Sequence, residues 1–204
     1  MKKIYLLSLV FLGFTFQAYS QEGKIFMGGD VGFSVTSFSN QSSSSPSSEY
    51  NLDILPTIGY FVSDKLAIGT GLGFSVYGDN YNSNPQVTTA TTNFSLSPFV
   101  RYSLMEVNNF SLIGQGIVSF GFGGSGSSSG GTTTTGPTTL NFSIGIGPGF
   151  QYKVSDKILL ESFFGNIGFY YDSTTPKNGT KSSSTKFDFS LSSGLGLGFI
   201  YIFN

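Results

Sequence analysis

Hydrophobic and polar residues alternate with a period of two along most of the chain after residue 24. Between 187 and 203, Phe, Leu and Tyr hold most odd positions, whereas the even positions from 188 to 198 carry Asp, Ser and Gly. A period of two is the side-chain period of a β-strand. The same alternation recurs along the chain and predicts eight strands, near residues 25–36, 50–61, 66–77, 91–104, 110–122, 140–154, 158–171 and 187–203.

The second face of these strands is unusual because it carries mostly Gly, Ser and Asn, with few charges. A soluble β-sandwich would present Lys, Glu and Thr to water at such positions. No apolar run in the predicted mature chain is long enough for a membrane helix, and a closed barrel is the other structure that can span lipid. The sequence therefore predicts an all-β fold, a closed eight-stranded antiparallel up-and-down transmembrane β-barrel, with its apolar face toward lipid.

A pattern P-x3-Y-x-[VL]-x-[DE] occurs three times, starting at Pro56, Pro98 and Pro148. Each copy ends a predicted strand and is followed by a short turn. The intervening gaps, at 38–49, 78–90, 123–138 and 172–186, are rich in Ser, Thr and Gly. Short turns that alternate with long loops are typical of outer-membrane barrels, in which the turns face the periplasm.

The tyrosines of this pattern have the same parity as the predicted lipid-facing residues and precede the short turns. We interpret four of them as an aromatic girdle at the periplasmic interface of the membrane: Tyr60, Tyr102, Tyr152 and Tyr201. The prolines lie deeper in the apolar band, where proline cannot donate to a strand ladder. We expect each proline to mark a bulge or a skipped ladder bond.

The N-terminal twenty residues have the layout of a cleaved signal peptide. Lys2 and Lys3 precede an apolar run at 4–16, and Ala18 and Ser20 are the small residues that suit cleavage before Gln21. An uncleaved anchor is the alternative. The expected organisation is a signal peptide at 1–20 and a barrel domain at 21–204. There is no cysteine, hence no disulfide framework.

Charged residues make up only 10% of the chain, and the net charge is −1. Without a basic cluster, nucleic-acid binding has no electrostatic support. Because the interior of an eight-stranded barrel is filled by side chains, rare inward charges should pair with one another. The inward parity predicts an interior polar network of Arg101, Asp53, Asp30, Asp188, Glu161 and Gln115. Such a network can be a structural polar plug or a path for protons or ions.

The chain contains no histidine. Ser-His-Asp chemistry is therefore impossible, and the abundant serines lack that general base. With no His and no Cys, transition-metal sites are improbable. We expect no enzyme activity, no catalytic residues and no cofactor or metal.

The last strand ends in glycine, two residues, an aromatic, one residue and an aromatic: Gly198, Tyr201 and Phe203, followed by Asn204. This ending resembles the assembly signal of the small outer-membrane barrels of Gram-negative bacteria, the OmpA/OmpX-like or "outer membrane protein beta-barrel domain" group within the porin-type small barrels. The resemblance implies a location in the cell outer membrane, contact with its lipid, and recognition by the barrel-assembly machinery.

These observations favour a non-enzymatic, monomeric surface barrel. It would present four flexible Ser/Thr/Gly-rich extracellular loops for surface contact, adhesion or envelope integrity. A narrow passive channel for ions or small solutes is the alternative, and a soluble secreted β protein is a further one. The low charge of the loops indicates no particular class of extracellular ligand.

Overall fold

The structure is a computed structural model that describes residues 21–38, 47–81, 83–191 and 197–203. The predicted signal peptide, loop residues 39–46 and 82, residues 192–196 of the predicted last strand, and Asn204 lie outside the described residues. The described part contains ten strands. They are β1 (Ile25–Ser37), β2 (Ser48–Phe61), β3 (Leu66–Tyr81), β4 (Val87–Val107), β5 (Phe110–Ser129), β6 (Thr132–Ser155), β7 (Ile158–Phe163), β8 (Gly165–Thr175), β9 (Ser182–Leu191) and β10 (Gly198–Ile202).

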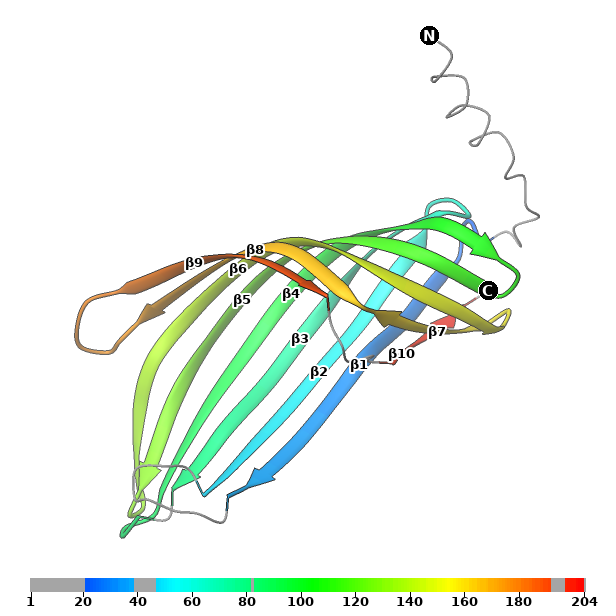
Figure 1. The fold of residues 1–204 in the computed structure, drawn as a ribbon. Helices are drawn as coiled ribbons and strands as arrows, with labels where there is room; N and C mark the ends of the chain where they lie inside the picture. The colour runs from blue at the N-terminus through cyan, green and yellow to red at the C-terminus, as the bar shows by residue number, and fades with distance from the viewer. Residues whose placement is uncertain (1–20, 39–46, 82, 192–196, 204) are drawn as a thin grey trace.

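The strands form one antiparallel sheet that closes on itself (Figure 1). Strands β1 to β6 pair in sequence order. Strand β6 then pairs with both β7 and β8, which flank Phe164 and together make the seventh strand of the barrel. Strands β9 and β10 supply the described parts of the eighth strand. The predicted closed eight-stranded antiparallel barrel is confirmed.

Closure occurs where the first and last strands meet. Phe26–Gly29 of β1 pairs with Phe199–Ile202 of β10 in four residue pairs. Beyond Gly29, the described pairing of β1 is to β2, and β9 pairs with β8. In Figure 1 the β8–β9 hairpin diverges from the far half of β1. The described part of the closing ladder thus lies at the end of the barrel that also carries the short turns.

The short turns lie at 62–65, 108–109 and 156–157, as predicted. In the first of them, the Ser63 hydroxyl accepts hydrogen bonds from the backbone N–H of Leu66 and Lys65, at 3.1 and 3.3 Å. Asn108 adopts φ 56°, a left-handed conformation that asparagine tolerates in tight turns. We call this the turn end of the barrel.

The opposite end differs from the prediction because the strands continue through most of the glycine- and serine-rich gaps. Residues 123–138, predicted as a loop, are paired strand on both sides of a two-residue turn at Gly130 and Gly131. These glycines have φ of 56° and 82°, which suits a two-residue hairpin turn. The predicted loops at 78–90 and 172–186 are also too long, since strands cover them up to Tyr81 and Thr175 and again from Val87 and Ser182. The β-branched threonines of these segments favour strand pairing.

Each proline of the repeated pattern interrupts one ladder. Strand β2 pairs with β1 through Pro56, but its ladder to β3 omits Leu55 and Pro56 and resumes in the same register. Strand β4 pairs with β3 through Pro98 and omits Ser97 and Pro98 toward β5. Pro148 pairs with Gly114 of β5. On its other side the ladder omits Gly147 and Pro148, and the register of β6 shifts by one residue between its pairing with β7 and its pairing with β8. The missing N–H of each proline therefore faces the following strand, and the skipped-bond prediction is confirmed.

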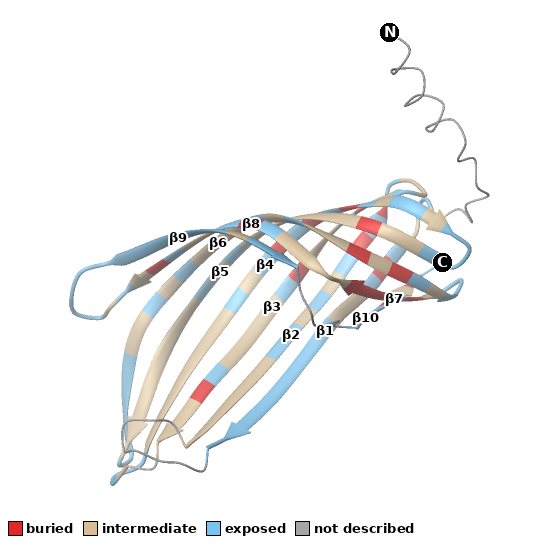
Figure 2. Cartoon of the chain, in the orientation of Figure 1, coloured by how far each residue is buried: buried red, intermediate tan, exposed pale blue. Residues whose placement is uncertain are grey.

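The outer surface of the barrel is an apolar belt. Val31 and Phe33 on β1 are 76% and 72% exposed, and Phe187 on β9 is 72% exposed. In Figure 2 most of the buried positions lie near the turn end, whereas the far halves of β1 and β9 are exposed. Water does not favour so large an apolar surface, and lipid does. The fold and surface are those of a barrel that spans a membrane.

Candidate functional site

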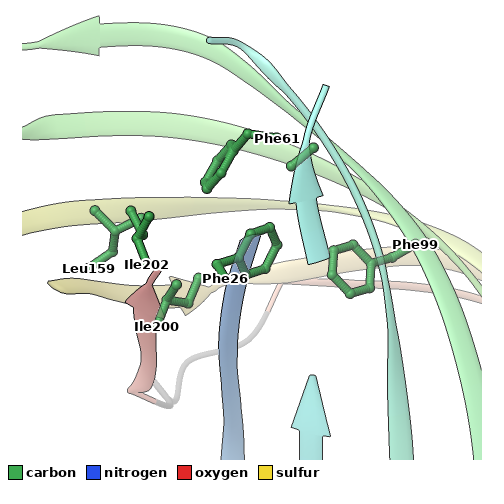
Figure 3. Close-up of a cluster of buried hydrophobic side chains, with 7 residues drawn as sticks. Phe26, Phe61, Phe99, Leu159, Ile200 and Ile202 are labelled. Carbon is green, nitrogen blue, oxygen red and sulfur yellow. The ribbon is translucent and has the colours of Figure 1, made fainter. Parts of the chain in front are cut away.

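A cluster of apolar side chains fills the lumen at the turn end (Figure 3). We call it the apolar plug. Its members face inward from six strands: Phe26, Phe61, Ala67, Phe99, Leu159, Ile200 and Ile202. The ring of Phe26 packs against Phe61 and Phe99, with centroid distances of 4.9 and 6.4 Å. Each member is at least 93% buried, and Phe61, Ala67 and Leu159 also line a small cavity.

Two glycines make room for the rings of the apolar plug. A Cβ atom on Gly59 would clash with Cζ of Phe26. A Cβ atom on Gly69 would lie 2.5 Å from Cζ of Phe99. Both contacts would be much shorter than van der Waals distance. The small inward residues of β2 and β3 therefore allow large rings from β1 and β4 to fill the lumen.

An ionic network lies next to the apolar plug. Arg101 on β4 places Nη1 2.7 Å from Oε2 of Glu161 on β7. Arg101 also donates from Nε and Nη2 to Oε1 of Gln115 on β5, at 3.0 and 2.7 Å. Gln151 on β6 donates from Nε2 to Oε2 of Glu161 at 3.1 Å. Four strands thus contribute one side chain each, and the ion pair is almost fully buried, with side-chain exposures of 8% on both sides.

The guanidinium of Arg101 is also surrounded by aromatic rings. Its Cζ lies 5.3 Å from the Phe99 centroid, 5.5 Å from Phe163 and 5.9 Å from Phe26. A cation over an aromatic face is stabilised by the ring quadrupole. The network and the apolar plug are therefore one packed unit.

The structure brings together only part of the predicted network. Arg101, Gln115 and Glu161 are in direct contact. Asp30 lies nearby: a Cβ on Gly198 would lie 3.0 Å from both Asp30 Oδ1 and Glu161 Cγ, and Arg101 attracts the Asp30 carboxylate.

Two predicted members lie elsewhere. Asp53 is exposed and accepts a hydrogen bond from Asn51 on the same strand. Asp188 pairs with Lys186 at 2.8 Å. Both occupy inward positions, as their parity predicted, but they lie at a different height along the barrel from Arg101. Both lie farther from the turn end than Arg101, because alternation reports which face a residue occupies and not its height along the barrel.

The sequence reasoning missed Gln151 and the apolar plug. The inward parity of Gln151 was visible and could have placed it beside Glu161. The apolar plug was missed because it departs from the alternation of apolar with small residues in the last strand. At Ile200 and Ile202 the inward positions are apolar too, so both faces of the strand are apolar there. An apolar residue on both faces at a strand end signals that the lumen is filled there.

Two cavities flank this unit. A cavity of about 90 Å³ lies at the mouth of the turn end, and Arg101, Ser103 and Gln21 are among its lining residues. Farther out, the inner wall of β4, β5, β6 and β8 is lined mainly by amides and hydroxyls, including Asn93, Asn141 and Tyr170. The lumen is therefore polar above the ionic network and apolar at the plug.

The predicted aromatic girdle residues all occupy outward positions near the turn end. Tyr60, Tyr102 and Tyr152 are 44%, 48% and 41% exposed. Tyr201 pairs with Met27 and Ile158, and its ring lies 5.0 Å from that of Phe203. Their role as an interface girdle stays a prediction, as does the role of Gly198, Tyr201 and Phe203 in assembly.

A separate ion pair lies at the β6–β7 turn, where the Asp156 side chain is 81% exposed. Lys153 Nζ lies 2.7 Å from Asp156 Oδ1, and the hydrogen bond from this ammonium lowers the pKa of Asp156 below its usual value. Within the described residues there is no group of His, Cys, Asp and Glu that could hold a metal ion. No helix in the described ranges is long and apolar enough to cross a membrane.

The closed eight-stranded sheet, its apolar exterior and its short turns at one end define a small outer-membrane β-barrel. A barrel of this type satisfies all backbone groups between strands and exposes its apolar face to lipid. The protein is accordingly a component of the outer membrane.

A solved structure with the same fold supports this classification. A major outer membrane protein from Thermus thermophilus aligns with a TM-score of 0.50 and 15% identity, covering 91% of this chain and all of that one. Two further barrels align less closely. OprG from Pseudomonas aeruginosa aligns with a TM-score of 0.46 and 14% identity, covering 90% of this chain and 97% of that one. Ail of Yersinia pestis aligns with a TM-score of 0.40 and 15% identity, covering 89% of this chain and 99% of that one. No family model and no curated protein sequence matches the chain. At these identities the likeness concerns the fold alone.

Proposed function

We propose that this barrel is a non-enzymatic surface protein that holds polar hairpins outside the cell above a lumen sealed at its periplasmic end. The observation that carries the proposal is the contrast between the two ends. The turn end is filled by the apolar plug and the ionic network. The other end extends into long paired hairpins, of which β5–β6 has an uncharged outer part and β8–β9 carries Lys177 and Lys181 at its tip.

The hairpins are long enough to leave the membrane. Strand β5 has 20 residues and β6 has 24. A strand of 20 residues is about 66 Å long at ~3.3 Å per residue. Tilted by ~40°, it rises about 50 Å, which exceeds the ~30 Å hydrocarbon core. The outermost part of this hairpin, Ser125–Ser129 against Thr132–Thr135, carries hydroxyls and glycines and would therefore lie in water. Ordered strands support a contact or coat role better than mobile loops would.

The alternative function, a narrow channel, would require a path through the apolar plug. The plug members are at least 93% buried, and an ion that passes them would lose its hydration without replacement ligands. The Arg101–Glu161 pair is balanced in charge and fully engaged, which favours the structural role over an ion path.

We expect the purified barrel to show no single-channel conductance above background in planar lipid bilayers. The physical reason is the closed apolar layer at the turn end. A general porin, recorded in the same bilayers, serves as the positive control for insertion and detection. Regular conductance steps from the folded barrel would contradict the proposal and favour the channel.

The proposed partners follow from the same features. Outer-membrane lipid contacts the apolar belt, and the C-terminal aromatic ending supports recognition by the barrel-assembly machinery. The packed and self-contained lumen supports a monomer. Adhesion and envelope integrity are both compatible with the hydroxyl-rich β5–β6 hairpin.

A further inference from the structure

Residues 21–24 fold back onto the turn between β2 and β3. The backbone N–H of Gln21 donates to Oδ1 of Asp64 at 2.8 Å, and that of Glu22 lies 3.4 Å from the same oxygen. Gly23 donates to the carbonyl of Phe61 at 2.9 Å, and Phe61 donates back to Lys24 at 3.0 Å. The φ of 82° at Gly23 permits this reversal. The start of the described chain is thus attached to the turn end.

Comparison of two equivalent turns shows that the Asp64 contact is specific. The β2–β3 turn contains Ser63-Asp64-Lys65 and the β6–β7 turn contains Ser155-Asp156-Lys157. In both, the serine hydroxyl accepts a hydrogen bond from the backbone of its own turn. The aspartates differ: Asp156 pairs with Lys153, whereas Asp64 accepts from Gln21. Serine supports the turn, and the carboxylate of Asp64 is available for residue 21.

We propose that Asp64 is the binding site for the α-ammonium group that appears on Gln21 when residues 1–20 are removed. The proposal rests on cleavage before Gln21. In the uncleaved chain the Gln21 nitrogen is an amide with one proton. After cleavage the same nitrogen carries a positive charge and three donors, at the position that already lies 2.8 Å from the carboxylate. A hydrogen bond becomes an ion pair, and charge-assisted bonds are about twice as strong as neutral ones.

This pairing controls a chemical modification of the mature end. An N-terminal glutamine cyclises when its unprotonated α-amine attacks Cδ of its own side chain. A C–N bond forms, the side-chain nitrogen leaves as ammonia, and a neutral pyroglutamyl ring results without any redox change. The Asp64 carboxylate holds the proton on the amine and directs the amine away from Cδ. Asp64 thus preserves Gln21 as an open-chain, positively charged terminus.

Other charged groups near this site do not replace Asp64. The cavity that Gln21 and Asp64 line also contains Lys65, Lys153, Arg101 and Glu106. Arg101 is engaged with Glu161, and Lys153 with Asp156. The remaining lysine, Lys65, repels an ammonium. Of the two carboxylates that line the cavity, Asp64 and Glu106, it is Asp64 that accepts the hydrogen bond from the Gln21 nitrogen.

The test uses the full chain, secreted, processed and purified as a folded barrel. N-terminal sequencing and intact mass first establish whether the mature protein begins at Gln21. The rate of ammonia loss is then followed by mass spectrometry at neutral pH for wild type, Asp64→Asn and Asp156→Asn. We expect Asp64→Asn to cyclise up to about fivefold faster, the factor that corresponds to an exposed ion pair, and Asp156→Asn to match wild type.

The outcomes separate the two parts of the inference. A mature terminus other than Gln21 overturns the cleavage site. Cleavage before Gln21 with equal cyclisation rates in all three proteins overturns the role of Asp64, as does complete cyclisation in freshly purified wild type. Electrophoretic mobility before and after boiling verifies that each variant is folded, since Ser63 and not Asp64 supports the turn.

Discussion

Replacing Arg101 with methionine is expected to lower the free energy of unfolding by about 3–5 kcal/mol, because it leaves Glu161 charged, buried and without its main partner. The Glu161 side chain is only 8% exposed. Arg101 contacts both of its oxygens, and Gln151 donates to Oε2. Urea unfolding of the barrel in lipid vesicles, followed by tyrosine fluorescence or gel mobility, measures the effect.

Comparison with a double variant separates the cost of an unpaired buried charge from the rest of the site. Combining Arg101→Met with Glu161→Leu removes both charges, and we expect the double variant to be more stable than Arg101→Met alone. Lys186→Met is the control, because Lys186 pairs with Asp188 in a 66% exposed position, where loss of a pair costs at most about 1 kcal/mol. Equal effects of Arg101→Met and Lys186→Met would contradict a buried network.

The second large effect is expected at the apolar plug. Phe26→Ala should lower the free energy of unfolding by about 3–5 kcal/mol, the range for truncation of a buried phenylalanine. Phe26 is only 1% exposed and contacts the rings of Phe61 and Phe99. The same unfolding experiment in vesicles measures the change.

Phe33→Ala is the matched control for this prediction. Phe33 lies on the same strand, but it is 72% exposed on the outer surface, so its removal leaves no cavity between side chains. We expect a clearly smaller loss of stability. If Phe33→Ala were as costly as Phe26→Ala, the stabilising layer would not be the lumen plug.

Strand alternation predicted the architecture of this barrel well. The parity of residues such as Phe74 and Gly73 reports directly which side faces lipid, since the side-chain period of a strand is two. The Ser-Asp turns were also predictable, because these side chains bond the nearby backbone. Parity likewise placed Arg101 and Glu161 on the inner face.

Alternation did not predict how deep in the barrel an inward residue lies, or whether a glycine- and serine-rich segment forms paired strands. Asp53 and Asp188 share the inward parity of Arg101 but lie at other heights, and only the register of neighbouring strands determines height. The segment around Gly130 was predicted as a loop from its composition. Instead, pairing between Ser127 and Thr134 continues there, because the adjoining membrane-spanning parts of β5 and β6 place both segments side by side in register.

Strands β7 and β8, which together make the seventh strand of the barrel, show a further limit. The alternation at 158–171 predicts one strand, whereas the structure divides it at Phe164, where the N–H donates to the Pro148 carbonyl at 3.2 Å. The proline on the neighbouring strand sets the position of this irregularity. Such an effect depends on which residues are neighbours across the sheet, and a single strand's sequence does not contain it.

Disulfide formation across the closing ladder tests the central claim, a barrel closed by its first and last strands in an outer membrane, most directly. Met27 and Tyr201 are paired neighbours on β1 and β10, and Met27 and Ile58 are paired neighbours on β1 and β2. For the double variant Met27→Cys and Tyr201→Cys, we predict efficient oxidative cross-linking in outer membranes of intact cells. The efficiency should be comparable to that of the control double variant, Met27→Cys and Ile58→Cys. Cross-linking of the control pair without cross-linking of Met27 and Tyr201 would contradict closure of the barrel.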